Sequence, residues 1–155
     1  MKIAQIILPW IALPAEKYGG TERIVYTLTQ ELVKRGHEVT LFAAGDSHVT
    51  AKLDFIFPKS FGLQDNVKAT LTTSFNPLRH VTYAFSKAGE FDIIHSHTQY
   101  LGLAFAGLVS TPTIHTFHRV YQGTEDEIGL LTQFKSHNFV SISNSQRDLD
   151  LNFVA

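Results

Sequence analysis

Apolar residues recur along the chain in two alternating patterns, as short continuous runs and as longer segments with helical spacing. The run KIAQIIL, residues 2–8, is continuous and of strand length, which is typical of a parallel strand buried on both faces. In residues 21–35 the predicted apolar face of a helix consists of Ile24, Val25, Leu28, Leu32 and Val33. Gly36 follows where a left-handed residue commonly ends a helix. The next segment, HEVTLFAAG at residues 37–45, predicts a second strand.

The middle of the chain has a weaker pattern. Residues 53–57 predict a short strand that ends at Pro58, and the apolar spacing of residues 63–71 predicts a helix. Asn76 followed by Pro77 is typical of an N-cap with proline at the first helical position, so we expect another helix to begin there.

After Gly89 the alternation becomes regular. Three strands are predicted by FDIIHSH (91–97), TIHTFH (113–118) and NFVSIS (138–143). Helices are predicted by QYLGLAFAGLV (99–109) and EDEIGLLTQFKSH (125–137), and a last one begins at NSQRDL (144–149). This alternation predicts an α/β fold with a doubly wound, mainly parallel sheet and helices on both faces, which is a Rossmann-like architecture.

Composition and charge exclude several classes of protein. With 155 residues, of which 44% are hydrophobic and 17% charged, the chain fits one globular domain and not a disordered segment. The net charge of −1 provides no basic surface for nucleic acid, so we expect no such partner. The absence of cysteine removes disulfides, thiolate ligands and cysteine nucleophiles, and it suits a cytoplasmic location.

The first candidate for chemistry is YGGTER, residues 18–23, between the first predicted strand and helix. In a doubly wound sheet, ligands bind beyond the carboxyl ends of the strands. Gly19 and Gly20 would leave backbone N–H groups open at a helix N-terminus, where the dipole favours an anion. Since neither G-x-G-x-x-G nor G-x-x-x-x-G-K-[ST] is present, the pattern fits a plain turn with a helix cap as well as a phosphate or sugar site.

Histidines at strand ends form the second candidate. In FDIIHSH we expect His95 to be a hydrogen-bonded buried side chain and His97, one step into the loop, to face the crevice. His118 closes the next strand. Such imidazoles suit hydrogen bonds to hydroxyls or phosphates, or acid–base chemistry near neutral pH. We predict no metal site, because no cysteine is present and zinc would need ligands from separate strand ends.

A cluster of small polar residues follows the last predicted strand. Ser143 or Asn144 suits the N-cap of the next helix, and no G-x-S-x-G sequence surrounds these serines. We therefore expect no serine nucleophile at this strand end.

Six segments in order span nearly the whole chain and resemble the N-terminal domain of a family-4 retaining glycosyltransferase with the GT-B fold. They are MKIAQI, YGGTER, RGHEVTLFAAGDS, FDIIHSH, TIHTFH and FVSISNSQR. The resemblance implies that residues 1–155 form the acceptor-side half of a two-domain enzyme, whose C-terminal domain holds the nucleotide-sugar donor. No Glu-x7-Glu motif of such a donor domain is present, so we expect either an excised domain or one subunit of a split enzyme. The isolated chain would then be nearly inactive until a donor domain is supplied in cis or in trans.

The resemblance also implies roles for individual residues. The glycine-rich loop would approach the donor diphosphate and the transferred sugar, the two strand-end histidines would position the sugar or acceptor, and the last segment would line the cleft. The loop residues are Gly19, Gly20 and Thr21, the histidines are His97 and His118, and the cleft-lining residues are Ser143 and Gln146. The implied reaction is hexosyl transfer from a nucleotide-sugar to a small-molecule acceptor, with no cofactor and no metal.

Two other interpretations compete with this one. The chain could be a stand-alone Rossmann-like module that binds a small phosphorylated or sugar ligand without catalysis. A flavodoxin-like or receiver domain fits less well, because no acidic cluster and no phosphate-loop serines or threonines follow the first strand. The apolar loop around Trp10 and Ile11 is a candidate for contact with a lipid, and hence for peripheral membrane association.

Overall fold

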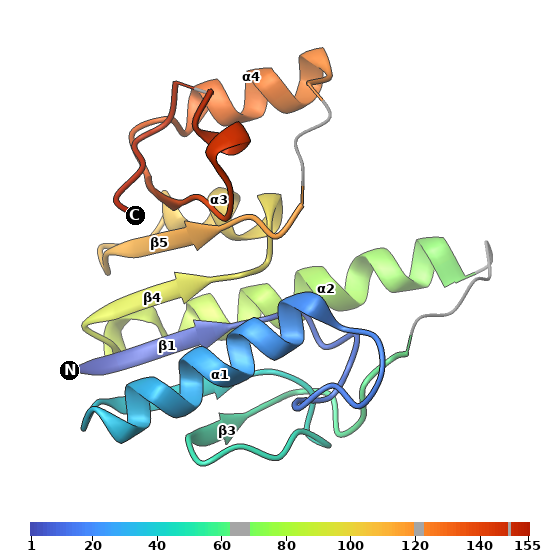
Figure 1. The fold of residues 1–155 in the computed structure, drawn as a ribbon. Coiled ribbons are helices and arrows are strands. Elements are labelled where there is room, and N and C mark those ends of the chain that lie inside the picture. Colours follow the sequence, from blue (N-terminus) through green and yellow to red (C-terminus); the bar gives the residue numbers. More distant parts are fainter. Residues whose placement is uncertain (63–68, 120–122, 149) are drawn as a thin grey trace.

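The computed structural model describes residues 1–62, 69–119, 123–148 and 150–155. Within these residues the strands form one six-stranded sheet with the order β3-β2-β1-β4-β5-β6, and every strand pair is parallel (Figure 1). The strands are β1 (Lys2–Ile6), β2 (Glu38–Phe42), β3 (Lys52–Asp54), β4 (Ile93–Ser96), β5 (Thr113–Thr116) and β6 (Asn138–Val140). The α-helices are α1 (Gly20–Lys34), α2 (Ala69–Ser86), α3 (Tyr100–Ala106) and α4 (Glu125–Gln133), and 3-10 turns span Ala88–Glu90 and Asn144–Asp148.

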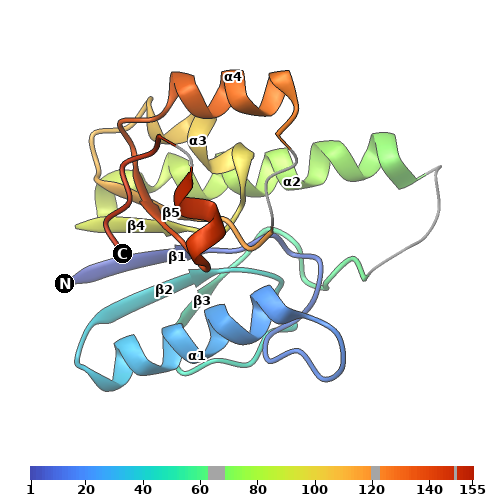
Figure 2. The same cartoon turned by 45° about the horizontal axis from the view of Figure 1, so that its top comes forward.

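Helices cover both faces of the sheet, as the alternating pattern predicts. Helix α1 lies on one face and α2, α3 and α4 lie on the other (Figure 2). Alternate residues of each strand point to opposite faces of the sheet, so both faces have apolar side chains for helices to cover. Ile6 and Ile94 pack with Val81 and Phe85 of α2 on one side, whereas alternate positions of β1 and β2 face α1 on the other side. The doubly wound Rossmann-like sheet is therefore confirmed.

The buried face of α1 differs from the predicted one. Ile24, expected on the apolar face, is 57% exposed, and the buried positions are Glu22, Val25 and Thr29. Their spacing of three and four residues is the spacing of one helical face. The register of α1 is thus set by Val25, which packs with Ile7 and Leu41, and the polar Glu22 and Thr29 are buried beside it.

The prediction that a helix begins at Asn76 is wrong. Asn76 and Pro77 lie inside α2, which begins at Ala69 in the described part of the chain. An interior proline removes a backbone hydrogen bond and costs about 3 kcal/mol. Val81, Ala84 and Phe85 are buried against the sheet further along α2, and this packing offsets the cost. Of the helix predicted over 63–71, residues 63–68 lie outside the described residues.

The C-terminal part departs from the prediction in three places. Helix α4 ends at Gln133, so Lys135 and His137 lie beyond it, and residues 144–148 form a 3-10 turn. Residues 152–154 pair with β6, where the Phe139 N–H donates to the Asn152 carbonyl and the Val154 N–H to the Phe139 carbonyl, both at 2.9 Å. None of the described helices is long and apolar enough to cross a bilayer.

Candidate functional site

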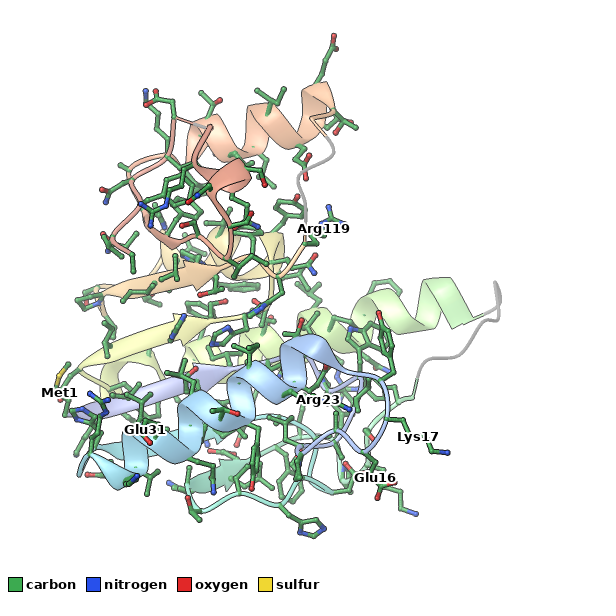
Figure 3. All side chains as sticks on the ribbon, in the orientation of Figure 1. Met1, Glu16, Lys17, Arg23, Glu31 and Arg119 are labelled. Atoms are coloured by element: carbon green, nitrogen blue, oxygen red, sulfur yellow. The ribbon has the colours of Figure 1, made fainter. Side chains whose placement is uncertain are left out.

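The order of the strands reverses between β1 and β4, which lie side by side at the centre of the sheet. Chain progression runs from β1 through β2 to β3 on one side and from β4 through β5 to β6 on the other. In such sheets the crevice beyond the carboxyl ends of these two strands is the usual place for a ligand. Figure 3 shows the loops at this edge, where Arg119, Arg23, Lys17 and Glu16 lie, with Met1 and Glu31 at the opposite edge.

A continuous chain of hydrogen bonds crosses this switch point. Gln5 of β1 pairs in register with His95 of β4, and its amide nitrogen lies 3.5 Å from His95 Nδ1. The amide oxygen of Gln5 lies 2.8 Å from His97 Nε2, and His97 Nδ1 lies 2.9 Å from His118 Nε2. At the other end, His95 Nε2 lies 2.8 Å from Thr116 Oγ1. We call these five side chains the histidine network.

The histidine network is neutral at physiological pH. Burial, together with a smaller contribution from the neighbouring His118, lowers the pKa of His95 to about 4. Burial also holds the pKa of His97 well below its usual value, with further lowering from His95 and His118. His118 is half-buried, and its pKa is lowered by burial alone. The network therefore offers imidazole rings and not cations to a ligand.

The order of exposure within FDIIHSH is the reverse of the predicted one. His97 is only 4% exposed and both its ring nitrogens are hydrogen-bonded, whereas His95 is the more exposed of the two. The His97 ring lies between the rings of His95 and His118, with centroids 4.1 and 5.1 Å away, and the buried Gln5 amide oxygen contacts its Nε2. The hydrogen-bonded state expected of His95 is confirmed, and a ligand role for His97 stays a prediction.

The two glycines of YGGTER differ in what they do. Gly19 precedes α1 with φ of 137°, and a Cβ there would lie 2.7 Å from Ala15 Cβ and 2.9 Å from Glu22 Oε2. Gly20 opens the helix, and a Cβ there would have no heavy atom within 4 Å. Gly19 is thus required by the backbone, while Gly20 leaves the helix N-terminus open. Thr21 follows in the first turn and is half-buried.

A cavity of about 570 Å³ lies beside this loop. It is lined by Ile11–Pro14 and Glu16–Tyr18 on one side and by the loop after β2 on the other, where the Asp46 carboxylate accepts hydrogen bonds from Ser60 N–H and Oγ at 2.9 and 3.0 Å. Trp10, expected to be exposed, is half-buried and packs edge-on against Phe61 with ring centroids 5.6 Å apart. The apolar surface of this loop is therefore smaller than the sequence indicates.

Arg119 follows His118 at the end of β5, and sequence reasoning assigned it no role. Its guanidinium lies 5.0 Å from the ring centroid of Tyr100 and donates a hydrogen bond to the Tyr100 hydroxyl at 3.0 Å. Tyr100 in turn donates to the Glu127 carboxylate, which also accepts from the Gly123 N–H at 2.7 Å. The signal that could have identified Arg119 is a cation directly after a strand-closing histidine.

Gln146 has a structural explanation. It is 2% exposed, and its amide nitrogen donates to the carbonyls of Phe117 at 3.1 Å and Arg119 at 2.9 Å. Its amide oxygen accepts from the Ile142 N–H at 2.8 Å, so Gln146 ties the ends of β5 and β6 together. Ser143 is exposed and hydrogen-bonds Ser145 at 2.9 Å. Cleft-lining roles for Ser143 and Gln146 stay predictions.

A parallel sheet with this strand order and helices on both faces defines the chain as a Rossmann-like α/β domain. Residues 18–149 match the sequence model of glycosyltransferase family 4. The chain belongs to glycosyltransferase family 4.

Known proteins resemble the chain over one part of their length. It is 30% identical over 114 residues to the alpha-monoglucosyldiacylglycerol synthase of Streptococcus pneumoniae, which covers 67% of this chain and 24% of that protein. The sucrose-phosphate synthase of Thermosynechococcus elongatus superposes with a TM-score of 0.62 at 17% identity, over 95% of this chain and 43% of that one. HepE of Anabaena, solved in complex with UDP, gives a TM-score of 0.53 at 16% identity, over 96% of this chain and 39% of that one. The chain thus spans less than half of each relative.

Proposed function

We propose that the chain is the acceptor-side domain of a retaining glycosyltransferase that moves a hexosyl group from a nucleotide-sugar to a small-molecule acceptor. The observation that carries the proposal is the contact of His97 with His118 at the switch point of a family-4 chain. The names of the relatives support the reaction class, because one is a glucosyl-lipid synthase and another was solved with UDP.

The open start of α1 is the part of the site suited to the donor diphosphate. Gly20 places no side chain at the positive end of this 15-residue helix, and Gly19 makes no side-chain cap there, so an anion is favoured at this end. The buried Glu22 carboxyl lies in the same turn, where burial raises its pKa and a hydrogen bond to its own backbone N–H lowers it. We assign Gly19, Gly20 and Thr21 to the donor side of the site on this basis.

His118 is the histidine suited to contact the sugar or acceptor. It is half-buried at the rim, whereas His97 behind it has both ring nitrogens bonded to protein atoms. His97 would then act through His118. The cavity of about 570 Å³ is large enough for a small-molecule acceptor, but its lining includes neither His97 nor His118, so we do not assign the acceptor to it.

The protein's contribution to transfer would be positioning and charge stabilisation. In this mechanism the leaving diphosphate assists removal of the acceptor proton, so no carboxylate nucleophile, cofactor or metal is needed. The basic residues and the Glu-x7-Glu motif of a donor domain would come from a C-terminal domain in cis or in trans. The chain alone would hold the acceptor and turn over little or no donor.

The test is a titration of the chain with UDP-glucose, UDP-galactose and GDP-mannose, with and without the C-terminal half of a family-4 enzyme. Release of the nucleoside diphosphate is followed, and release with the pair but not with either half supports the proposal. Absence of release from every donor and every pair would refute it. Binding of a sugar phosphate by the chain alone, without turnover in any pair, would favour the binding module.

A further inference from the structure

Gln5 is the one buried polar side chain in the run KIAQIIL of the first strand, and it touches no solvent. Its two amide ends contact different histidines of β4, with the oxygen on His97 at 2.8 Å and the nitrogen on His95 at 3.5 Å. A buried amide that lost such partners would carry a desolvation cost of about 1–3 kcal/mol. An apolar residue would avoid that cost, so the placement of Gln5 calls for a reason.

The amide fixes where the protons of the histidine network lie. An amide oxygen only accepts, so the proton between Gln5 and His97 lies on His97 Nε2. Neutral His97 then has an unprotonated Nδ1, and the proton between the two rings must lie on His118 Nε2. On the other side the Gln5 amide nitrogen donates to His95 Nδ1, so His95 donates from Nε2 to Thr116 Oγ1. One amide orientation thus sets three tautomers.

We propose that Gln5 is a positioning residue, which acts through His97 to hold neutral His118 in the Nε2-protonated form with Nδ1 as its unprotonated atom. Among the residues that the structure describes, no hydrogen bond engages His118 Nδ1, and the ring is half-buried at the rim of the site. The inference rests on the proposed function for its consequence. His118 would accept a hydrogen bond from a ligand hydroxyl and would have no N–H to offer a phosphate oxygen.

The unprotonated Nδ1 of His118 decides which group of a ligand can bind beside it. A hydroxyl of the transferred sugar or of the acceptor is a donor that neutral Nδ1 can bind, whereas a diphosphate oxygen is an acceptor and would meet a lone pair. The diphosphate therefore belongs at the N-terminus of α1 and the hydroxyl at His118. The reversed orientation of the Gln5 amide would reverse every proton along the network and assign the phosphate to His118.

The experiment is long-range ¹H–¹⁵N NMR on the full chain labelled at histidine, which reports which ring nitrogen carries the proton. Signals are assigned from the variants His95→Gln and His118→Gln. In the native chain we expect Nε2–H for His95, His97 and His118. A Nδ1–H signature at His118 would overturn the inference.

Two substitutions of Gln5 separate positioning from packing. Gln5→Glu keeps the shape and offers only acceptors, so Nδ1 of His95 should become protonated while His97 and His118 keep their Nε2 protons. Gln5→Leu removes the acceptor for His97, and the signals of His97 and His118 should move to averaged positions. If His118 stays unchanged in Gln5→Leu while melting curves show a folded chain, Gln5 does not set its tautomer and the inference fails.

Thr116→Val is the matched control at the far end of the network. It removes the acceptor for His95 Nε2 and should alter the His95 signal alone, because the Gln5 amide still fixes His97. In a pair that releases nucleoside diphosphate, Gln5→Leu should lower kcat on the order of 10-fold to 100-fold with little change in KM, and Gln5→Glu should retain more activity. Correct tautomers in a chain that no pair activates would refute the proposed function and leave the positioning inference standing.

Discussion

Lowering the pH from 7.5 to 5.5 should destabilise the folded chain through its buried histidines. Burial lowers the pKa of His80 to about 4, of His95 to about 4 and of His115 to about 3, against the ordinary value of 6.5. Because the folded-state pKa values are depressed, the unfolded chain takes up protons in this window and the folded chain does not. The stabilisation is complete above pH 6.5 and is lost as the pH falls toward the folded-state values.

The magnitude follows from proton linkage. Between pH 7.5 and 5.5, proton uptake at each of His80, His95 and His115 stabilises the unfolded chain by roughly 1.3 kcal/mol. Together the three lower the free energy of unfolding by about 4 kcal/mol. Burial also lowers the pKa values of His97 and His118, which adds loss of the same sign. Glu22 acts in the opposite sense because burial raises its pKa, and its ordinary value of 4.5 lies below the pH of the measurement.

Urea unfolding followed by circular dichroism at pH 7.5, 6.5 and 5.5 measures the effect. A loss of about 4 kcal/mol corresponds to a fall of about 2 M in the urea midpoint for a slope near 2 kcal/mol per M. His115→Phe isolates one contribution. His115 is buried with neither ring nitrogen bonded among the described residues, and its ring centroid lies 5.8 Å from that of Phe139, so an apolar ring fits its place.

His115→Phe should therefore reduce the acid-induced loss by about one third, and by about 1.3 kcal/mol at pH 5.5. His48→Asn, at an exposed position, is the control for replacing a histidine outside the buried set. A urea midpoint that does not move between pH 7.5 and 5.5 would refute the reasoning. So would a His115→Phe variant with the full acid-induced loss.

Four further substitutions test the site and the elements that support it by thermal melting, and one of them also by activity. Gly19→Ala should destabilise the chain by about 1–3 kcal/mol, because the φ of 137° is strained for alanine and the added Cβ would overlap Ala15. Gly20→Val should melt near the native temperature but abolish nucleoside diphosphate release by the active pair. Unfolding of Gly20→Val would contradict the assignment of Gly20 to the donor site. Thr124→Ala should cost about 1 kcal/mol, because Thr124 Oγ1 accepts the Glu127 N–H at the start of α4, and an unchanged melting temperature would contradict the cap. Gln146→Leu should lower the free energy of unfolding by about 2–4 kcal/mol, because the carbonyls of Phe117 and Arg119 and the Ile142 N–H lose their partner. An unchanged melting temperature would show that the Gln146 amide is not needed to connect β5 and β6.

The strands were predictable because a parallel strand buried on both faces has a continuous apolar sequence. KIAQIIL contains β1 and HEVTLFAAG contains β2. Because alternating strands and helices predict a parallel sheet, the carboxyl ends of all strands were expected at one edge. The start of α2 was not predictable from Asn76 and Pro77, because tertiary packing outweighed the local preference of proline. The cap of α4 was predictable, since Thr124 and Glu127 have the T-x-x-E spacing of a capping box.

The histidine network shows where sequence reasoning about a site ends. His95 and His97 are two residues apart and lie on one face, but their partner Gln5 is 90 residues from His95 along the chain. The signal for Gln5 was present as a polar residue within an apolar run. Its partners follow only from the register of β1 with β4, which the sequence does not specify.

The two faces of the central strands differ in a way that explains why the network lies where it does. On the face of α2 and α3, β1 and β4 carry Ile6 and Ile94, which pack into the apolar core. On the opposite face α1 packs with Ile7 and Leu41, toward β2. The histidine network occupies this second face from β1 across β4 to β5, next to the helix instead of beneath it. Gln5, His97 and Thr116 are buried within the network, so His95 and His118 are the members that remain partly exposed on this face.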